Sequence, residues 1–187
     1  QNPQFFIENQ VQDELNPHDE IDPVVSAQTI IKHVTDGVEL AKKHHLPNRV
    51  IDFIREHHGT MHTHYQYSQA VKVAGDADKV DKSRFTYPGP RPQSRETALL
   101  MLADGTEARA RAEVPKDEEE LSSLIDTVVN FYTQNGQLED TNLTLKDIQK
   151  AKDSFYRTLK GTYHPRVKYP ALDQGKKESN TSETTSH

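Results

Sequence analysis

Apolar residues recur at helical spacing along most of the chain. Asp22-Pro23 opens a first long helix, in which apolar residues follow the i, i+3, i+4 pattern from Ala27 until it fades at His44-His45. A second, shorter helix is predicted from Pro47, which fits a first helical turn, to His57-His58. Gly59 is suited to end this helix, because glycine tolerates the left-handed backbone found after many helices.

The rest of the chain continues this pattern. A short helix is predicted around Tyr65–Val73, followed by a polar linker and a rigid proline-rich loop over 85–90. Longer helices are predicted over 93–112 and from Asp117 to Asn135-Gly136. A last one is predicted from Thr144 to about 161, with Asp147 three residues after Thr144 as a variant of the capping box. No convincing strand alternation or internal repeat is found, so the sequence predicts an all-α fold.

Length and composition favour one domain. The chain has 187 residues, enough for a single hydrophobic core, and we predict a domain over 1–169. Residues 170–187 have almost no large apolar groups and end in ESNTSETTSH, which is typical of a disordered tail. The sequence has no run of 18 apolar residues and no signal-peptide pattern, so we expect this chain to be soluble and without a membrane span.

Charge and cysteine usage narrow the possible functions. Acidic and basic residues are mixed along the chain, with a net charge of −6 and no basic stripe, which argues against a long nucleic acid as partner. A small anionic ligand remains compatible, because a bound metal can supply a local positive field. The absence of cysteine excludes disulfides, thiolate zinc sites and cysteine nucleophiles.

Four residues have the chemistry of metal ligands. His33 lies within the first predicted helix, His57-His58 ends the second, and Asp104 follows six consecutive apolar or small residues. A carboxylate beside such a run is expected to be partly buried and therefore to need a partner. Three imidazoles and one carboxylate on separate helices of a bundle suit a site for Fe, Mn or Zn.

Each of these residues also has a purely structural explanation. His33 alone is typical of a partly buried histidine hydrogen-bonded to a neighbour, and a histidine pair stabilises a helix C-terminus when it is protonated. An arginine such as Arg109 or Arg111 is a simple partner for Asp104. Spacing alone leaves both interpretations open.

The segment YPGPRPQSRE, residues 87–96, is a second place of interest. Its prolines and glycine fix the backbone just before a helix begins. The segment is either a stiff connection or a substrate wall, in which Arg91 and Arg95 receive phosphate and Pro88-Gly89 lets a flat base approach. His62 and His64, in the tyrosine-rich stretch HTHYQY, either join the metal site or are surface or pocket-rim groups.

Taken together, these segments resemble a known family, the cytosolic HD domain of the seven-transmembrane HD phosphodiesterases. These bacterial proteins hydrolyse cyclic di-AMP. The resemblance extends over nearly all of 5–170, and EHHGT combined with YPGPRPQSRETA is highly specific. The segments that carry it are FFIENQ (5–10), NPHD (16–19), SAQTIIKHVTDGVELA (26–41), LPNRVIDFIREHHGT (46–60), YPGPRPQSRETALLMLAD (87–104) and GQLEDTNLTLKDI (136–148).

The resemblance implies an HD-domain helical bundle with two divalent metal ions, Fe or Mn. The ligand order of the family is a histidine, His-Asp, a histidine, His-His and an aspartate. His33 matches the lone middle histidine, His57-His58 the pair and Asp104 the last aspartate. His33 and His57 are then ligands of one ion and Asp104 of the other, while His58 is either a ligand or a phosphate contact. The residues implied for nucleotide contact are Arg95, Tyr65, Tyr67 and Pro88.

The departures from the family pattern limit what this chain can do alone. The first histidine and the His-Asp pair have no match here and would precede Gln1, so the resemblance implies an N-terminally truncated domain. That aspartate bridges the two ions in the family, and without it we expect the chain to bind metal poorly and to be inactive. A smaller departure is Gly105, which stands where the family more often has serine.

The function expected for the complete protein is metal-dependent hydrolysis of cyclic di-AMP to the linear dinucleotide pApA. The resemblance also implies that the complete protein is anchored in the bacterial membrane, with this domain on the cytoplasmic face. Two alternatives stay open: a cyclic-dinucleotide-binding sensor module without catalysis, and an HD phosphohydrolase that acts on another nucleotide. An intact His-Asp pair upstream would favour an enzyme, and a substituted pair would favour the sensor.

Overall fold

The computed structural model describes residues 21–163, which form α-helices and short 3-10 helices. Within this range no strand forms, and His62 and Thr86 make an isolated antiparallel bridge. The prediction of an all-α fold is therefore confirmed. The disordered tail from 170, the domain end at 169 and the motifs FFIENQ and NPHD lie outside the described residues.

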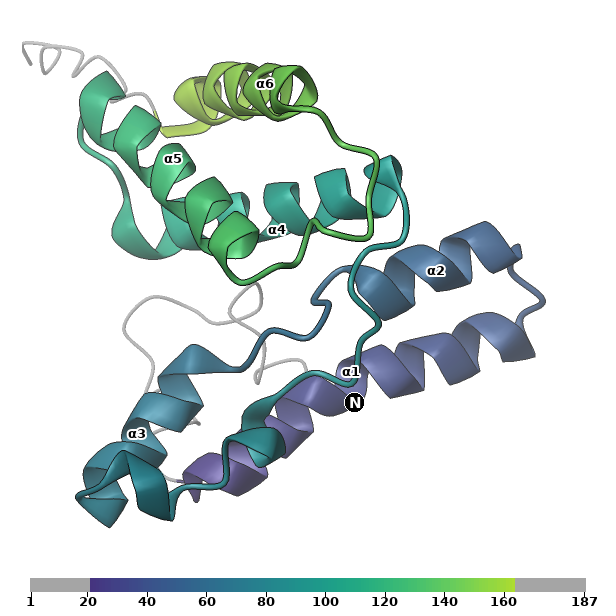
Figure 1. The fold of residues 1–187 in the computed structure, drawn as a ribbon, viewed down its shortest axis with the longest axis vertical. Helices are drawn as coiled ribbons and strands as arrows, with labels where there is room; N and C mark the ends of the chain where they lie inside the picture. Colours follow the sequence, from purple (N-terminus) through teal and green to yellow (C-terminus); the bar gives the residue numbers. More distant parts are fainter. Residues whose placement is uncertain (1–20, 164–187) are drawn as a thin grey trace, which may run out of the picture.

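Helices α1 (Pro23–Lys43) and α2 (Asn48–Glu56) form an antiparallel hairpin (Figure 1). The Asp22 carboxylate begins α1 by accepting two backbone amides of its first turn, at 2.9 and 3.2 Å. Gly37 lets the two helices approach closely, because a Cβ at this position would lie 2.9 Å from Cγ2 of Ile54. The hairpin brings the middle of α1 beside the C-terminal end of α2.

A second, smaller layer packs on α1. It contains α3 (His64–Ala74) and the 3-10 helices η3 (Ala77–Lys79) and η4 (Lys82–Phe85), which lie together beside the N-terminal half of α1 in Figure 1. Two main-chain hydrogen bonds of 2.8 Å join residues 61–63 to residues 85–87. The predicted polar linker after α3 is thus a pair of short 3-10 turns that leads into the proline-rich loop.

The remaining helices, α4 (Arg95–Glu113), α5 (Glu118–Gln134) and α6 (Leu145–Tyr163), enclose the main hydrophobic core. The predicted cap of α6 is confirmed, because Thr144 Oγ1 donates to the Asp147 carboxylate at 2.7 Å and accepts the Asp147 amide at 3.2 Å. The buried members of this core are Ala98, Leu102, Ala110, Leu121, Leu124, Ile125, Val128, Val129, Leu138 and Leu159.

The molecule thus has two helical units. The first unit, residues 21–93, contains α1 to α3, and the second unit, residues 94–163, contains α4 to α6; Figure 1 shows them as its lower and upper halves. Arg91 joins them, since its guanidinium pairs with Glu139 at 2.7 Å and with Asp140 at 3.0 Å. The buried Glu56 carboxylate adds a contact within the first unit by accepting the backbone amide of Gln93 at 2.9 Å.

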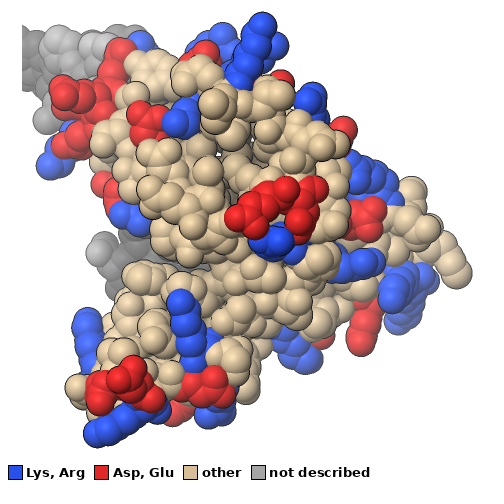
Figure 2. Space-filling view, viewed as in Figure 1, with Lys and Arg blue, Asp and Glu red and all other residues tan. Residues whose placement is uncertain are grey.

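Charged side chains of both signs are interspersed on the surface. Figure 2 shows acidic and basic groups side by side over both units, with no continuous basic stripe on the face in view. Between residues 21 and 163, none of the helices combines the length and the apolar character needed to cross a bilayer.

Candidate metal centre

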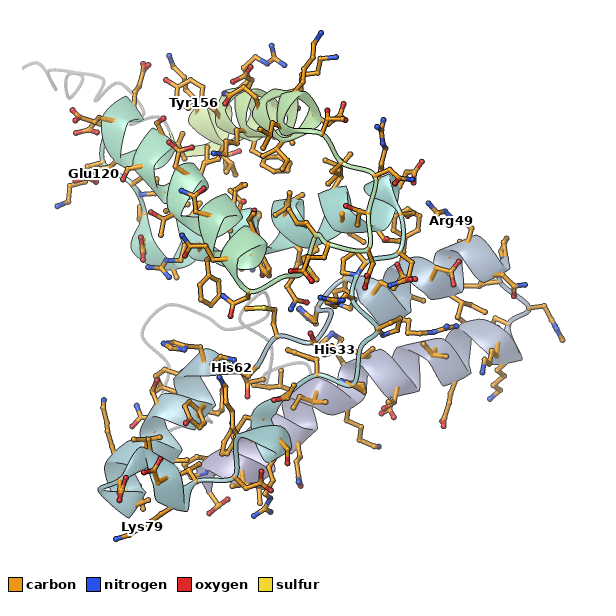
Figure 3. All side chains as sticks on the ribbon, viewed as in Figure 1. His33, Arg49, His62, Lys79, Glu120 and Tyr156 are labelled. Atoms are coloured by element: carbon orange, nitrogen blue, oxygen red, sulfur yellow. The ribbon has the colours of Figure 1, made fainter. Side chains whose placement is uncertain are left out.

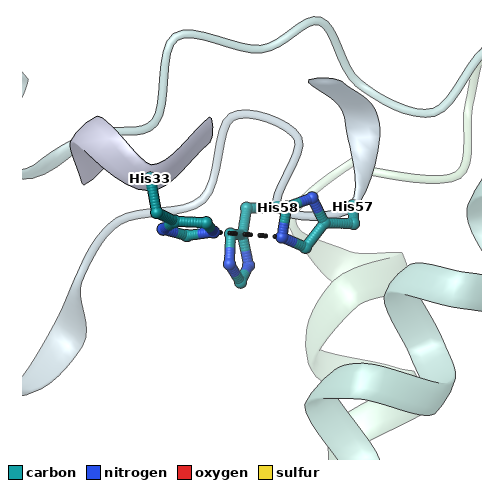
Figure 4. A group of neighbouring side chains, drawn as sticks. All are labelled: His33, His57 and His58. Carbon is teal, nitrogen blue, oxygen red and sulfur yellow. Dashed lines mark hydrogen bonds between the residues drawn. The ribbon is translucent and has the colours of Figure 1, made fainter. Parts of the chain in front are cut away.

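Three imidazoles meet where the first unit faces the second. His33 comes from the middle of α1, and His57 and His58 follow the last turn of α2 (Figure 3, Figure 4). The His33 ring centroid lies 5.3 Å from that of His57 and 5.0 Å from that of His58. One nitrogen from each ring lies within 4.8 Å of the other two, so the α1–α2 hairpin by itself assembles three nitrogen donors.

Backbone carbonyls fix the tautomers of two of these rings. Nδ1 of His33 donates to the Ile30 carbonyl at 2.5 Å, and Nδ1 of His57 donates to the Ile54 carbonyl at 2.8 Å. Each ring therefore carries its proton on Nδ1, and in the neutral imidazole this leaves a lone pair on Nε2. A hydrogen bond from Nδ1 to a carbonyl is the usual way in which proteins orient a histidine that binds metal through Nε2.

The two Nε2 atoms face each other at 3.1 Å, along the dashed line in Figure 4. Two lone pairs at this distance repel unless a proton or a cation lies between or beside them. Two nitrogens bound at right angles to one ion, each at roughly 2.1 Å, would lie about 3.0 Å apart. The observed spacing therefore fits a pair of ligands to one metal ion.

Asp104 lies at the edge of this group. His58 Nδ1 is 4.0 Å from the Asp104 carboxylate, which α4 of the second unit supplies. The aspartate side chain is 43% exposed, so it is partly buried as predicted but still reachable from solvent. The arginines considered as its structural partners pair with glutamates on their own helix, Arg109 with Glu113 and Arg111 with Glu107.

Tyr87 supports the third imidazole. Its ring stacks on His58 with a centroid distance of 4.3 Å and an interplanar angle of 22°, and it also packs edge-on against His33. Tyr87 is buried, so the stack restrains the plane of the His58 ring. The sequence reasoning included Tyr87 in that loop without giving it a role at the site; its position just before Pro88 was the available signal.

Burial keeps two of the imidazoles neutral. Desolvation lowers the pKa of His57; the hydrogen bond to Ile54 opposes this shift, and the neighbouring His33 imidazole adds to it. Burial, followed by the neighbouring imidazoles His57 and His33, lowers the pKa of His58 to about 2. At neutral pH both rings are therefore in the unprotonated form that binds metal.

The residues implied for nucleotide contact are more dispersed. Arg95 is the first residue of α4, and its partners lie within the second unit: its Nε donates to the Asn142 carbonyl at 2.9 Å and its guanidinium pairs with Asp147 at 3.3 Å. On α3, Tyr65 is 45% exposed and Tyr67 packs against the rings of its neighbours. Pro88 is exposed at the loop surface. Nucleotide contact by these four residues stays a prediction.

His62 and His64 stand apart from the three imidazoles. Their ring centroids lie 5.6 Å from each other, and His62 packs edge-on against Tyr67. Burial lowers the pKa of His62, with a further contribution from the Lys82 charge. Among residues 21–163, the histidines that cluster at metal-ligand distance are His33, His57 and His58, which favours the rim interpretation for the 62–65 stretch.

Two further side chains reach the site from the end of α5. Tyr132 packs over Gly105, and burial together with the Asp104 carboxylate raises the pKa of its phenol to about 12. Gln137 is almost fully buried and hydrogen-bonds to Thr60. Neither was identified from the sequence as a site residue, although the GQLED motif that contains Gln137 was among the segments carrying the resemblance.

Known proteins share both the fold and this arrangement of segments. The crystal structure of the L. monocytogenes phosphodiesterase PgpH HD domain superposes with a TM-score of 0.77 at 33% identity, over 87% of this chain and 74% of that chain. The same domain in complex with cyclic-di-AMP superposes with a TM-score of 0.79 at 32% identity, over 86% of this chain and 73% of that chain.

Sequence relatives agree with the structural ones. The cyclic-di-AMP phosphodiesterase PgpH of Bacillus subtilis is 35% identical over 168 residues, which are 90% of this chain and 23% of the relative. The protein of that name in Listeria monocytogenes is 34% identical over the same shares. An uncharacterised protein of Synechocystis sp. is 40% identical over 176 residues, 91% of this chain and 22% of the relative. The chain thus spans about a quarter of the length of the curated relatives it matches.

The HD domain family model matches residues 10–109, more than half of the chain, and this range contains His33, His57-His58 and Asp104. The expected HD-domain helical bundle is therefore confirmed by fold, by sequence and by the convergence of three imidazoles. The chain belongs to the HD-domain family.

Proposed function

We propose that the complete protein is a metal-dependent phosphodiesterase that hydrolyses cyclic di-AMP to pApA. The observation that carries the proposal is the pair of Nε2 atoms that face each other at 3.1 Å, with both Nδ1 protons held by carbonyls. Support for the substrate comes from the similarity to an HD domain that was crystallised with cyclic-di-AMP.

The proposed centre takes two divalent ions, iron or manganese. His33 and His57 would bind one ion through Nε2, His58 would bind the same ion or contact the phosphate, and Asp104 would supply an oxygen to the second ion. When bound, such ions neutralise charge on the phosphate and make water a better nucleophile. Burial lowers the pKa of His57 and of His58, carbonyls orient His33 and His57, and Tyr87 limits rotation of the His58 ring.

Contacts to the nucleotide are proposed for Tyr65, Tyr67, Pro88 and Arg95. The exposed Tyr65 ring and the half-buried Tyr67 ring would stack on a base, and Pro88 would line the wall that the base approaches. Arg95 pairs with Asp147 in the structure, so contact with a phosphate would exchange one anionic partner for another.

The test uses the complete gene product, with whatever sequence precedes and follows this chain. We expect hydrolysis of cyclic di-AMP with Mn²⁺ or Fe²⁺, and a fall of at least about 100-fold in kcat/KM for His57→Ala and for Asp104→Ala, because even the residues that orient metal ligands are typically worth 10- to 100-fold. His44→Ala is the matched control, since His44 is exposed at the far end of α1. Turnover that is indifferent to His57→Ala would sink the proposal.

The same assay separates the alternatives. Binding of cyclic di-AMP without cleavage by the complete, metal-loaded protein would identify a sensor module. Faster turnover of cyclic di-GMP or of a mononucleotide would identify an HD phosphohydrolase with another substrate. Attachment of the complete protein to the cytoplasmic face of the membrane is a separate proposal, which rests on the family resemblance and is tested by cell fractionation.

A further inference from the structure

The segment that ends α5 contacts the chain immediately after each half of the metal centre. Residues 132–137, called here the bridging segment, lie at the junction of the two units (Figure 1). Tyr132 packs on Gly105, the residue after Asp104, and Gln137 packs on Gly59, the residue after His58. In both places the bridging segment occupies space that a side chain on the glycine would need.

The Gln137 contact fixes the turn that carries the histidine pair. Its Oε1 accepts the Thr60 amide at 3.0 Å, and its Nε2 donates to Thr60 Oγ1 at 3.0 Å and to the Asn135 carbonyl at 3.0 Å. The side chain is 2% exposed, so these hydrogen bonds are sheltered from water. A Cβ on Gly59 would lie 2.3 Å from the Gln137 side-chain oxygen, so a side chain at position 59 would clash with Gln137 as it is placed.

The Tyr132 contact fixes the helix position that follows the aspartate. A Cβ on Gly105 would lie 2.4 Å from the Tyr132 hydroxyl and 2.6 Å from its Cε2. Gly105 lies within α4, where glycine is unfavourable compared with alanine, so the close approach of the phenol accounts for its presence. The Tyr132 ring packs against the apolar clusters of both units, and it thereby links Asp104 to the first unit.

We propose that the bridging segment sets the separation between the His57-His58 turn and Asp104, with Tyr132 and Gln137 as positioning residues for the two metal positions. The proposal rests on the function proposed above. Its physical basis is that His58 and Asp104 sit on different units, 4.0 Å apart at their nearest polar atoms, and metal sites tolerate little displacement of their ligands. One stretch of chain that touches the residue after each ligand can hold that distance.

The first experiment measures Mn²⁺ affinity and stoichiometry of the complete gene product by titration calorimetry, together with cyclic di-AMP hydrolysis. For Gln137→Ala and Tyr132→Leu we expect Mn²⁺ affinity to fall by roughly 10- to 100-fold. Leu124→Ala is the control, because it weakens the core of the second unit without a described contact to the site. The control should unfold more easily yet, when folded, bind Mn²⁺ as the wild type does.

The second experiment is a double-mutant cycle, which stays informative if Gln137→Ala does not fold. Gly105→Ala should weaken Mn²⁺ binding in the wild type, because the new methyl displaces the phenol. In the Tyr132→Leu background the same change should have little further effect, since the three atoms nearest to the new Cβ all belong to the end of the tyrosine ring.

The two proposals fail in different ways. The positioning role is overturned if Gly105→Ala and Tyr132→Leu bind Mn²⁺ as tightly as the wild type, or if Gly105→Ala has the same effect in both backgrounds. Neither result bears on whether the wild-type protein hydrolyses cyclic di-AMP. Weakened Mn²⁺ binding in these variants supports the positioning role, even in a protein that turns out not to cleave cyclic di-AMP.

Discussion

The two helical units differ in what they contribute: the second contains the larger apolar cluster, and the first contains the three imidazoles. The second unit holds ten buried apolar residues in one cluster, whereas the first unit has a cluster of three, Val34, Met61 and Tyr87. The first unit nevertheless supplies all three imidazoles of the centre. Both units expose some apolar side chains, for example Val73 at 83% in the first and Leu145 at 86% in the second. We infer that the second unit, with the larger apolar cluster, contributes more to stability than the first, and that a bound metal would stabilise mainly the unit that supplies the imidazoles.

The largest expected effect comes from the second unit. Ile125 is 2% exposed in the core of α5, so Ile125→Ala should cost about 2–5 kcal/mol of unfolding free energy. Val73→Ala, on the exposed side of α3, should change it by less than about 0.5 kcal/mol. Urea denaturation measures both. Similar losses for the two variants would contradict the unequal division of the core.

Metal loading should act on the first unit. At a Mn²⁺ concentration of 100 times Kd, the complete gene product should gain about 2.7 kcal/mol of stability, since the ion binds the folded state. His33→Ala should remove this gain. Hydrogen exchange of the amides of α1 and α2 should slow on metal addition more than that of α5. Equal slowing of hydrogen exchange in both units would contradict the prediction that metal stabilises mainly the first unit.

Acid should also act on the first unit. The pKa of His58 is lowered to about 2 and that of His57 is lowered as well, whereas an unfolded histidine titrates near 6.5. Above about pH 6.5 both states are unprotonated and the stability is fully present. As pH falls below that value, these histidines become protonated in the unfolded chain but stay neutral in the folded one. The free energy of unfolding therefore decreases until the pH reaches the lower pKa of the folded state.

For His58 alone this loss amounts to about 1.4 kcal/mol per pH unit. Denaturation in EDTA from pH 7 to pH 5 measures it, and His58→Gln should make the slope shallower. An unchanged slope in this variant would show that His58 is not the group responsible.

The smallest effect is expected from a surface ion pair of the second unit. Arg109 and Glu113 are about half exposed and pair along one face of α4. Arg109→Ala should therefore cost less than about 0.5 kcal/mol and leave Mn²⁺ affinity unchanged. Thermal unfolding with and without metal checks both statements. A larger cost would mean that charges, and not only the core, stabilise the second unit.

Sequence patterns predicted the helices well, because helix spacing and caps depend on short-range chemistry. Asp22-Pro23 opens α1 as predicted, and the Thr144 cap begins α6, since a cap requires only neighbouring residues. The predicted start of the helix after the proline-rich loop, at 93, lies two residues before that of α4, because Ser94 and Thr97 form a capping box that places the start at Arg95.

The sequence by itself determined an all-α chain and four residues with the chemistry of metal ligands, because spacing and residue type are local properties. Only the tertiary structure decided that the Nε2 atoms of His33 and His57 face each other, since this needs α1 and α2 to close at Gly37. It also decided that Gln137 meets Thr60, 77 residues earlier in the chain. The first contact depends on how α1 packs on α2 and the second on how the two units pack, and packing is a property of the whole fold that no short pattern contains.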